Sequence, residues 1–290
     1  MKIAIYGLGL IGGSIGRAAL KKTDHTVYGF DIVPENVVKA KLAEAITDEL
    51  NEVKLGETDM VVLSLYPEAA ISVMNRILPK LKSGAIVIDC CGTKRKIVGA
   101  MEKAKVEYPD IEFVGIHPMA GREFSGISHA LPTLFENGYV IVTPVHSDIR
   151  ALTAVKRFFI DLGACGIEVA TAEKHDKMIA YTSQLAHVLS SSYIKSELSN
   201  CYTGFSAGSF RDMTRVAKLN PAMWTELCIE NRDNLVERID ELVLHLNEFR
   251  DALAKGDEKE VYRLFEDGTK MKNQAENLMK ERKKNDRNQS

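Results

Sequence analysis

Residues 2–14 read Lys-Ile-Ala-Ile-Tyr-Gly-Leu-Gly-Leu-Ile-Gly-Gly-Ser. The apolar run from Lys2 to Tyr6 predicts a buried β-strand, and the glycines that follow it form the pattern G-x-G-x-x-G. Glycine lets the backbone turn tightly and approach a pyrophosphate closely. The helix predicted after the turn would point its free N–H groups and its positive dipole end at that pyrophosphate. The stretch therefore predicts a dinucleotide site that contains Gly7, Gly9, Leu10, Ile11 and Gly12.

The residues that follow support this interpretation. A second strand is predicted over Thr26–Phe30, and Asp31 stands at its end, 22 residues after Gly9. A carboxylate at this place can accept hydrogen bonds from ribose hydroxyls and would repel a ribose phosphate, which favours NAD over NADP. The next apolar strand ends at Ser64 and Leu65, which we add to the predicted cofactor site. The alternative is a strand, turn and helix that bind no ligand.

Composition limits the classes of protein to which the chain can belong. Its 290 residues exceed the usual size of a single core, and 45% hydrophobic with 27% charged residues is typical of a globular protein. A formal net charge of −2 gives no reason to expect a nucleic-acid or membrane partner. The five cysteines lack metal-type spacing, so we expect no metal site and a reducing compartment. No targeting or membrane-spanning segment is evident, and we expect a cytoplasmic protein.

The pattern of the chain changes after about residue 172. Before that point continuous apolar strands alternate with helices, which predicts a parallel, doubly wound sheet covered on both faces. Thr93 is well placed to cap one of these helices. Beyond residue 172, only long amphipathic helices are predicted, over Glu173–Asn200, Pro221–Lys255 and Asp257–Arg282. We therefore predict an α/β protein with a Rossmann-type domain over residues 1–172 and an all-α domain over residues 173–290.

Several polar side chains are candidates for chemistry. His117 directly follows an apolar strand, where an imidazole could accept a hydroxyl proton, although a structural histidine is equally compatible with that position. Ser183 and His187 lie four residues apart and share one helix face. Arg211 and Arg215 flank a carboxylate and suit a small anionic substrate, with a surface ion-pair ladder as the alternative.

Four blocks of sequence resemble the TyrA family of prephenate dehydrogenases nearly from end to end. They are the glycine-rich stretch 7–14 and the segments His117-Pro-Met-Ala-Gly-Arg-Glu123, Ser183-Gln-Leu-Ala-His187 and Gly208-Ser-Phe-Arg-Asp-Met-Thr-Arg215, the last followed by Pro221-Ala-Met-Trp224. The resemblance implies NAD-dependent oxidative decarboxylation of prephenate to 4-hydroxyphenylpyruvate, a step toward tyrosine. It also implies a homodimer whose helical domains interlock.

Roles of individual residues are implied by the same resemblance. His117 would take the hydroxyl proton, and Thr93 stands where the family commonly has a serine that orients the histidine and the nicotinamide. Arg215 would bind the ring carboxylate, and His187 with Ser183 would meet the polar side chain of the substrate. The last block adds Gly208 and Arg211 to substrate binding. An ionic network at the entrance would comprise Glu123, Arg211 and Asp212, with Trp224 nearby.

One departure and three alternatives remain. Ala186 replaces a proline that is usual in the family, so the helix around it should be less kinked. The substrate could be arogenate, which carries an amino group where prephenate has a keto group. The protein could be a non-catalytic NAD-binding sensor, because a fold alone does not define a function. A β-hydroxyacid dehydrogenase would carry a lysine and, four residues later, an asparagine, whereas Lys177 is followed there by Tyr181.

Overall fold

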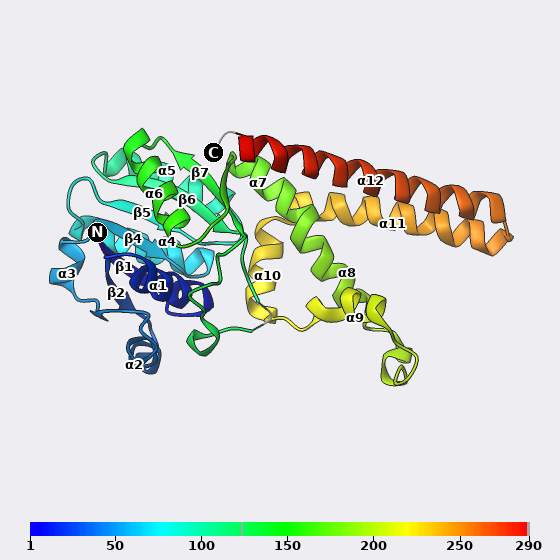
Figure 1. Ribbon diagram of the computed structural model, residues 1–290, viewed down its shortest axis with the longest axis horizontal. Coiled ribbons are helices and arrows are strands. Elements are labelled where there is room, and N and C mark those ends of the chain that lie inside the picture. The colour runs from blue at the N-terminus through cyan, green and yellow to red at the C-terminus, as the bar shows by residue number, and fades with distance from the viewer. Residues whose placement is uncertain (123, 289–290) are drawn as a thin grey trace. The chain divides into compact units, whose positions relative to one another are not determined.

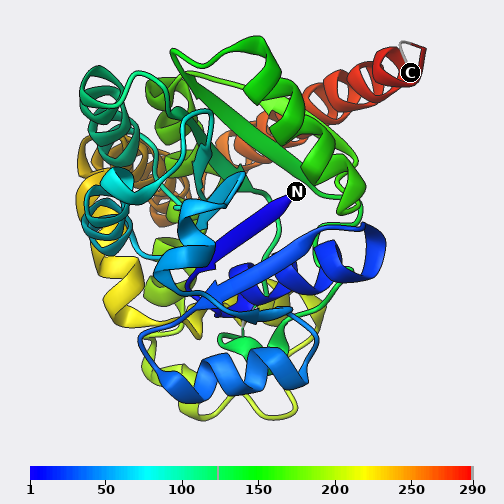
Figure 2. The same ribbon diagram turned by 90° about the vertical axis from the view of Figure 1, so that its left-hand side faces the viewer.

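The computed structural model describes residues 1–122 and 124–288, with side chains up to residue 281. Within these residues, eight strands form one sheet in the order β3-β2-β1-β4-β5-β6-β7-β8 (Figures 1 and 2). The strands are β1 (Lys2–Tyr6), β2 (Thr26–Phe30), β3 (Asp48–Glu49), β4 (Met60–Leu63), β5 (Ile86–Asp89), β6 (Glu112–Pro118), β7 (Tyr139–Val145) and β8 (Gly166–Val169). The predicted Rossmann-type sheet is confirmed, and the short edge strand β3 is an addition that the sequence did not indicate.

The sheet is not entirely parallel, which corrects one expectation. Strands β1 to β6 pair in parallel, but β7 pairs antiparallel to β6, with His117 opposite Ile141. Parallel pairing needs a crossover that carries the chain back to the other end of the sheet, usually a helix. The segment between β6 and β7 contains only a single 3-10 turn, Ile127–His129, among its described residues. The chain therefore enters β7 at the same end of the sheet at which it leaves β6.

Helices cover both faces of the sheet, as the continuous apolar strands predict. Helices α1, α2 and α6 pack on the face that holds Ile3 and Ile5, and α4 and α5 pack on the face that holds Ala4 and Tyr6 (Figure 2). Successive strand residues point to opposite faces, so a single strand serves two cores. The helices between the strands are α1 (Leu10–Lys22), α2 (Pro34–Leu42), α3 (Glu52–Gly56), α4 (Pro67–Ile77), α5 (Arg95–Glu107) and α6 (Ile149–Asp161).

The helices after β8 are more broken than predicted. In place of one helix over Glu173–Asn200, the chain forms α7 (Ala172–Ile179), a π-helical turn (Ala180–Gln184) and α8 (Leu185–Tyr193). A π turn is a local widening of the helix and is frequent at functional sites. The remaining helices are α9 (Gly208–Thr214), α10 (Pro221–Glu230), α11 (Arg232–Lys255) and α12 (Glu258–Asn288) (Figure 1). None of the described helices is both long enough and apolar enough to cross a membrane.

The chain divides into two compact units, of which the first extends from Met1 to Leu235 and the second begins at Val236. The first unit holds the sheet and α7 to α10. The second consists of most of α11 together with α12, which contact each other through Phe249 and Phe265, with ring centroids 5.0 Å apart. The domain boundary after residue 172 stays a prediction.

Gly16 and Gly99 provide a matched test of the packing of α1. A Cβ added at Gly16 would lie 1.9 Å from the carbonyl oxygen of Ala45, whereas one added at Gly99 in α5 would meet nothing within 4 Å. We expect Gly16→Ala to lower the free energy of unfolding by ~1–3 kcal/mol through overpacking. Gly99→Ala should raise it by ~0.5–1 kcal/mol, because glycine is costly inside a helix. Urea denaturation measures both values, and equal effects would contradict the described contact between α1 and Ala45.

Candidate active site

The turn between β1 and α1 has the geometry that a dinucleotide requires. Gly7 has a φ of +89°, and a Cβ there would lie 2.2 Å from the carbonyl oxygen of Ser64. A Cβ on Gly12 would lie 2.0 Å from the carbonyl oxygen of Gly7, so both positions exclude a side chain. Gly9 differs, because a Cβ there would meet nothing within 4 Å. Gly9 is also the N-cap of α1 and makes no side-chain cap bond, so open space lies at the helix N-terminus, where a pyrophosphate fits.

Asp31 closes this turn from β2. One carboxylate oxygen accepts the backbone N–H of Leu8 at 2.8 Å, and the other accepts the N–H of Val33 at 2.9 Å and the amide of Asn36 at 3.1 Å. Asp31 therefore holds the glycine turn as well as standing where a ribose would bind. Each carboxylate oxygen can accept more than one hydrogen bond, so ribose hydroxyls can be added to these contacts.

The predicted cofactor residues meet at one edge of the sheet. Because β2, β1, β4, β5 and β6 are neighbours in that order, their carboxyl ends present Asp31, the glycine turn, Ser64, Thr93 and His117 in the same order. The backbone N–H of Ser64 donates to the carbonyl of Tyr6 at 2.8 Å, and Leu65 packs on the core beside it. Leu10 and Ile11 form the first turn of α1. A dinucleotide that starts at Asp31 thus extends toward Thr93 and His117.

A chain of hydrogen bonds ends at His117. Nδ1 of His117 lies 2.8 Å from Nε2 of His175, and Nδ1 of His175 lies 2.7 Å from Oδ1 of Asp176. His175 and Asp176 are buried on α7, whereas His117 is partly exposed at the end of β6. Three residues from two distant parts of the chain therefore form one continuous relay.

This relay determines which nitrogen of His117 is free. An ionised carboxylate only accepts, so Nδ1 of His175 carries a proton and its Nε2 keeps a lone pair. Nδ1 of His117 must then donate to that lone pair, and Nε2 of a neutral His117 is left unprotonated. An unprotonated nitrogen at the sheet edge is what a base needs in order to accept a hydroxyl proton.

Electrostatics keep the relay in this protonation state. Burial, followed by His175 and the Lys94 ammonium, holds the pKa of His117 well below its usual range. Burial also lowers the pKa of His175. Although burial alone would raise the pKa of Asp176, hydrogen bonds from His175 and from the backbone of Arg95 and Lys94 bring it below the usual value. At neutral pH the relay thus consists of two neutral imidazoles and one carboxylate.

Asp176 also joins α7 to the N-terminus of α5. Its carboxylate accepts the backbone N–H of Lys94 at 2.7 Å and that of Arg95 at 2.9 Å, so it satisfies N–H groups that a helix start leaves unpaired. The Lys94 side chain is fully buried and forms an ion pair with Asp89, which is equally buried. The charge of this buried Lys94 ammonium is one of the causes that lower the pKa of His117 and of His175.

Thr93 does not cap α5, which corrects the expectation from the sequence. Lys94 is the N-cap residue and makes no side-chain cap bond, and the helix begins at Arg95. The Thr93 hydroxyl instead donates to Oε2 of Glu230 at 2.7 Å. The first turn of α5 already has a carboxylate from α7, so it does not need the hydroxyl.

A second group of predicted residues lies around the π turn and α10. His187 stacks on Trp224 with ring centroids 3.8 Å apart, and its Nδ1 donates to the carbonyl oxygen of Ser183 at 2.9 Å. Burial lowers the pKa of His187, and the charge of Arg215 adds to this effect. Arg215 begins the turn Arg215–Ala217, which packs against α8. Nε2 of His187 is left to accept a hydrogen bond. Ser183, His187, Arg215 and Trp224 are thus brought together.

The remaining predicted site residues lie on or near α9, or outside the described part of the chain. Gly208 begins α9 with open space around its α-carbon, and Arg211 and Asp212 lie exposed on the same helix. Glu123 lies outside the described residues. Among the side chains that the structure describes, no cluster of histidine, cysteine, aspartate or glutamate is arranged to hold a metal ion.

Sequence reasoning missed His175, Asp176 and Glu230. Adjacent His and Asp on a helix next to a predicted domain boundary were the available signal for the first two, but only the fold brings them to His117. Glu230 gave no signal, because a glutamate near a helix end is most often a solvated surface residue.

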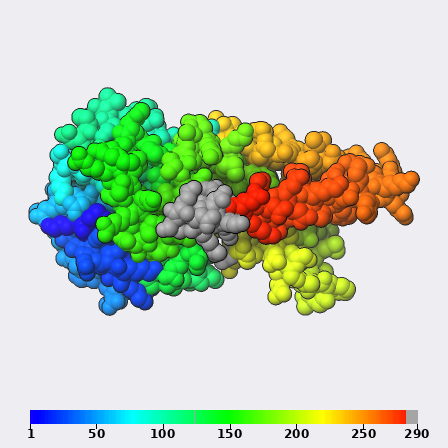
Figure 3. Space-filling view, turned by 45° about the horizontal axis from the view of Figure 1, so that its top comes forward, coloured from blue at the N-terminus to red at the C-terminus, as the bar shows by residue number. Residues whose placement is uncertain are grey.

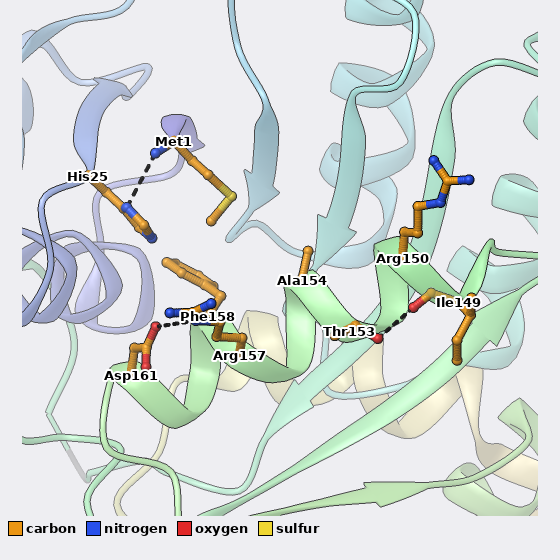
Figure 4. A pocket seen from close by; sticks show the side chains of 9 residues that line it. All are labelled: Met1, His25, Ile149, Arg150, Thr153, Ala154, Arg157, Phe158 and Asp161. Carbon is orange, nitrogen blue, oxygen red and sulfur yellow. Dashed lines mark hydrogen bonds and ion pairs between the residues drawn. The ribbon is translucent and has the colours of Figure 1, made fainter.

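A cavity lies away from these residues (Figure 4). It has a volume of about 540 Å³ and is lined by Met1 and His25, at the opposite ends of the strands, and by α6 from Ile149 to Asp161. It has no contact with the glycine turn or with the relay, and we do not assign the site to it.

A Rossmann sheet with a glycine turn, an acidic residue after β2 and a neutral histidine at its carboxyl edge defines a dinucleotide-dependent dehydrogenase. Residues 15–168 match the family described as prephenate dehydrogenase, nucleotide-binding domain, and residues 171–267 match prephenate dehydrogenase, dimerization domain. The matched segments span most of the chain. The chain belongs to the prephenate dehydrogenase family.

Individual relatives agree with this assignment. The chain is 30% identical to prephenate dehydrogenase of Bacillus subtilis over 91% of this chain and 73% of that protein. It is 32% identical to cyclohexadienyl dehydrogenase of Zymomonas mobilis, over 88% and 89% of the two chains. The crystal structure of prephenate dehydrogenase from A. aeolicus in complex with hydroxyphenyl propionate and NAD+ superposes with a TM-score of 0.82 and 28% identity, covering 95% of this chain and 98% of that one.

The relay predicts a tautomer that can be observed. Ring nitrogen chemical shifts of ¹⁵N-labelled protein at neutral pH should show His117 neutral, with its proton on Nδ1. Asp176→Asn replaces a group that only accepts by an amide that can accept or donate, so the proton order of the relay is lost and His117 should then populate both tautomers. His245, which pairs with Glu248 on an exposed helix, is an internal control and should not change. A wild-type His117 protonated on Nε2 would overturn the assignment.

Proposed function

We propose that this protein oxidises and decarboxylates prephenate to 4-hydroxyphenylpyruvate with NAD as the hydride acceptor. The observation that supports the proposal most directly is the relay from Asp176 through His175 to His117, because it leaves a base with a free nitrogen at the same edge of the sheet as the dinucleotide turn. Family membership supplies the substrate class.

The residues suit each part of this reaction. The glycine turn and Asp31 would hold NAD, whose nicotinamide would accept a hydride from the hydroxyl-bearing ring carbon. His117 accepts the hydroxyl proton on Nε2, and its Nδ1 proton stays shared with His175, which spreads the new positive charge toward Asp176. The ring carboxylate then leaves as carbon dioxide, the electrons of the broken C–C bond make the ring aromatic, and the former carbonyl oxygen takes the proton back from His117 as the phenol forms. The protein therefore has to bind an anion and orient the donor carbon.

The group around the π turn is proposed to bind the substrate. Arg215 would hold a carboxylate, since a guanidinium binds carboxylate oxygens in a bidentate fork. His187 can accept a hydrogen bond through Nε2, with its ring held flat against Trp224. The proposed site also includes Ser183, Gly208 and Arg211, with Asp212 and Glu123 in an ionic network at the entrance. Arogenate is the alternative substrate.

The test is NADH formation by the purified protein with each substrate and each cofactor. We expect prephenate with NAD to react fastest, because Asp31 disfavours a ribose phosphate. His117→Asn should lower kcat roughly 10²–10⁴-fold, since the base is lost, and should leave NAD binding unchanged. A strong preference for arogenate would replace the proposed substrate. Unchanged turnover in the His117→Asn variant would refute the role of the base.

We further propose that the protein forms a homodimer through the helical part of residues 173–290. In the second compact unit, large apolar side chains on α11 and α12 are exposed, among them Leu244, Leu253, Phe265 and Leu278 (Figure 3, orange to red). Several large exposed apolar side chains on one pair of helices favour a protein interface there. Light scattering should give twice the chain mass of 32.2 kDa, whereas a monomer at micromolar concentration would contradict the proposal.

A further inference from the structure

Glu230 is a buried carboxylate that the reaction described above does not use. It is the last residue of α10, and its side chain is only 8% exposed. Oε2 accepts the Thr93 hydroxyl at 2.7 Å, and Oε1 lies 3.1 Å from the Lys96 ammonium. A buried charge is costly unless it is paired, and among the described residues the Thr93 hydroxyl and the Lys96 ammonium are the partners of this carboxylate.

The pairing restricts what Thr93 can do. An ionised carboxylate has no proton to donate, so the Thr93 hydroxyl is the donor in this bond. Toward any other group, its oxygen can therefore act only as an acceptor. Thr93 follows β5, between Ser64 after β4 and His117 after β6, which is the nicotinamide side of the dinucleotide edge.

The position of Glu230 is determined by the packing of α10. A Cβ on Gly92 would lie 3.2 Å from the Leu227 side chain, so the glycine allows α10 to approach the turn after β5. Asn231, which follows Glu230, is fully buried and donates to the Asp176 carbonyl and the Gln184 side chain, both at 2.8 Å. Glu230 thus has little freedom to move away from Thr93.

We propose that Glu230 is a positioning residue that acts through Thr93 on the nicotinamide end of the cofactor site, a role that rests on the proposed function. By taking the hydroxyl proton, Glu230 holds the Thr93 oxygen as an acceptor that matches the N–H donors of the nicotinamide carboxamide. The same bond anchors the turn after β5. Glu230 therefore orients the hydride acceptor without contacting the reacting atoms.

The experiment compares two ligands that share the adenosine end of the cofactor. The affinity of NADH is measured by its own fluorescence and that of ADP-ribose by competition, for wild type, Glu230→Gln, Thr93→Val and the double variant. We expect Glu230→Gln and Thr93→Val each to weaken NADH binding roughly tenfold and to leave ADP-ribose binding unchanged. The glutamine amide can donate to the Thr93 oxygen as well as accept its proton, so the oxygen is no longer held as an acceptor, and valine removes the hydroxyl altogether. The double variant should be no weaker than Thr93→Val, since the two residues act as one unit.

Glu226→Gln is the matched control. Glu226 lies on the same helix, and its carboxylate accepts only the exposed backbone N–H of Glu68 among the described bonds, at 3.0 Å. This variant should bind NADH as the wild type does. In steady-state assays Glu230→Gln should lower kcat roughly tenfold with the KM for prephenate within twofold, and the unchanged ADP-ribose affinity excludes loss of folded protein as the cause.

Three results would overturn the proposal. They are equal weakening of NADH and ADP-ribose, unchanged NADH affinity in Glu230→Gln, and effects of the two single changes that multiply in the double variant. The binding comparison needs no turnover. If the wild type forms no NADH from prephenate or arogenate, the proposed function fails, whereas the NADH and ADP-ribose affinities still decide the role of Glu230.

Discussion

The arrangement of the first compact unit depends on the hydrogen bonds that the Asp176 carboxylate accepts. It accepts two backbone N–H groups at the start of α5 and the ring N–H of His175. The first two bonds attach α7 to the edge of the Rossmann sheet, and the third orders the protons along the relay to His117. One buried acceptor thus serves both packing and chemistry, because a carboxylate has enough lone pairs to do both.

A second buried charge gives the relay its electrical environment. Lys94 and Asp89 form a fully buried pair, and Asp89 also accepts the N–H groups of Cys91 and Ile116. Burying two charges is expensive, and such a pair is seldom a net source of stability. Here the ammonium acts with burial to disfavour imidazolium at both histidines. Burial is the larger cause of a neutral His117 and the ammonium adds to it, whereas the Asp89 carboxylate acts in the opposite direction on His175.

Helix α10 links the two groups of candidate residues. Trp224, near its start, stacks on His187, and Glu230, at its end, accepts the Thr93 hydroxyl. Asn231 and Gln184 form buried hydrogen bonds around the helix end and the π turn. Buried polar networks of this type specify one arrangement of neighbouring elements, because each group left unpaired would be costly. Proposed substrate and cofactor residues are therefore held by one short helix.

The sequence by itself determined the cofactor side of this protein. The local signals were the glycine spacing, the continuous apolar strands and Asp31. A tight turn requires glycine and a strand buried on both faces requires an apolar run, so each is visible within a few residues of sequence. It also indicated His117, His187 and Arg215 as candidates. Only the tertiary structure decided the antiparallel entry of β7, the partner of Thr93 and the relay behind His117. The last two depend on contacts between residues separated by 58 to 137 positions, such as His117 with His175 and Thr93 with Glu230, and no local pattern encodes which distant side chain arrives beside another.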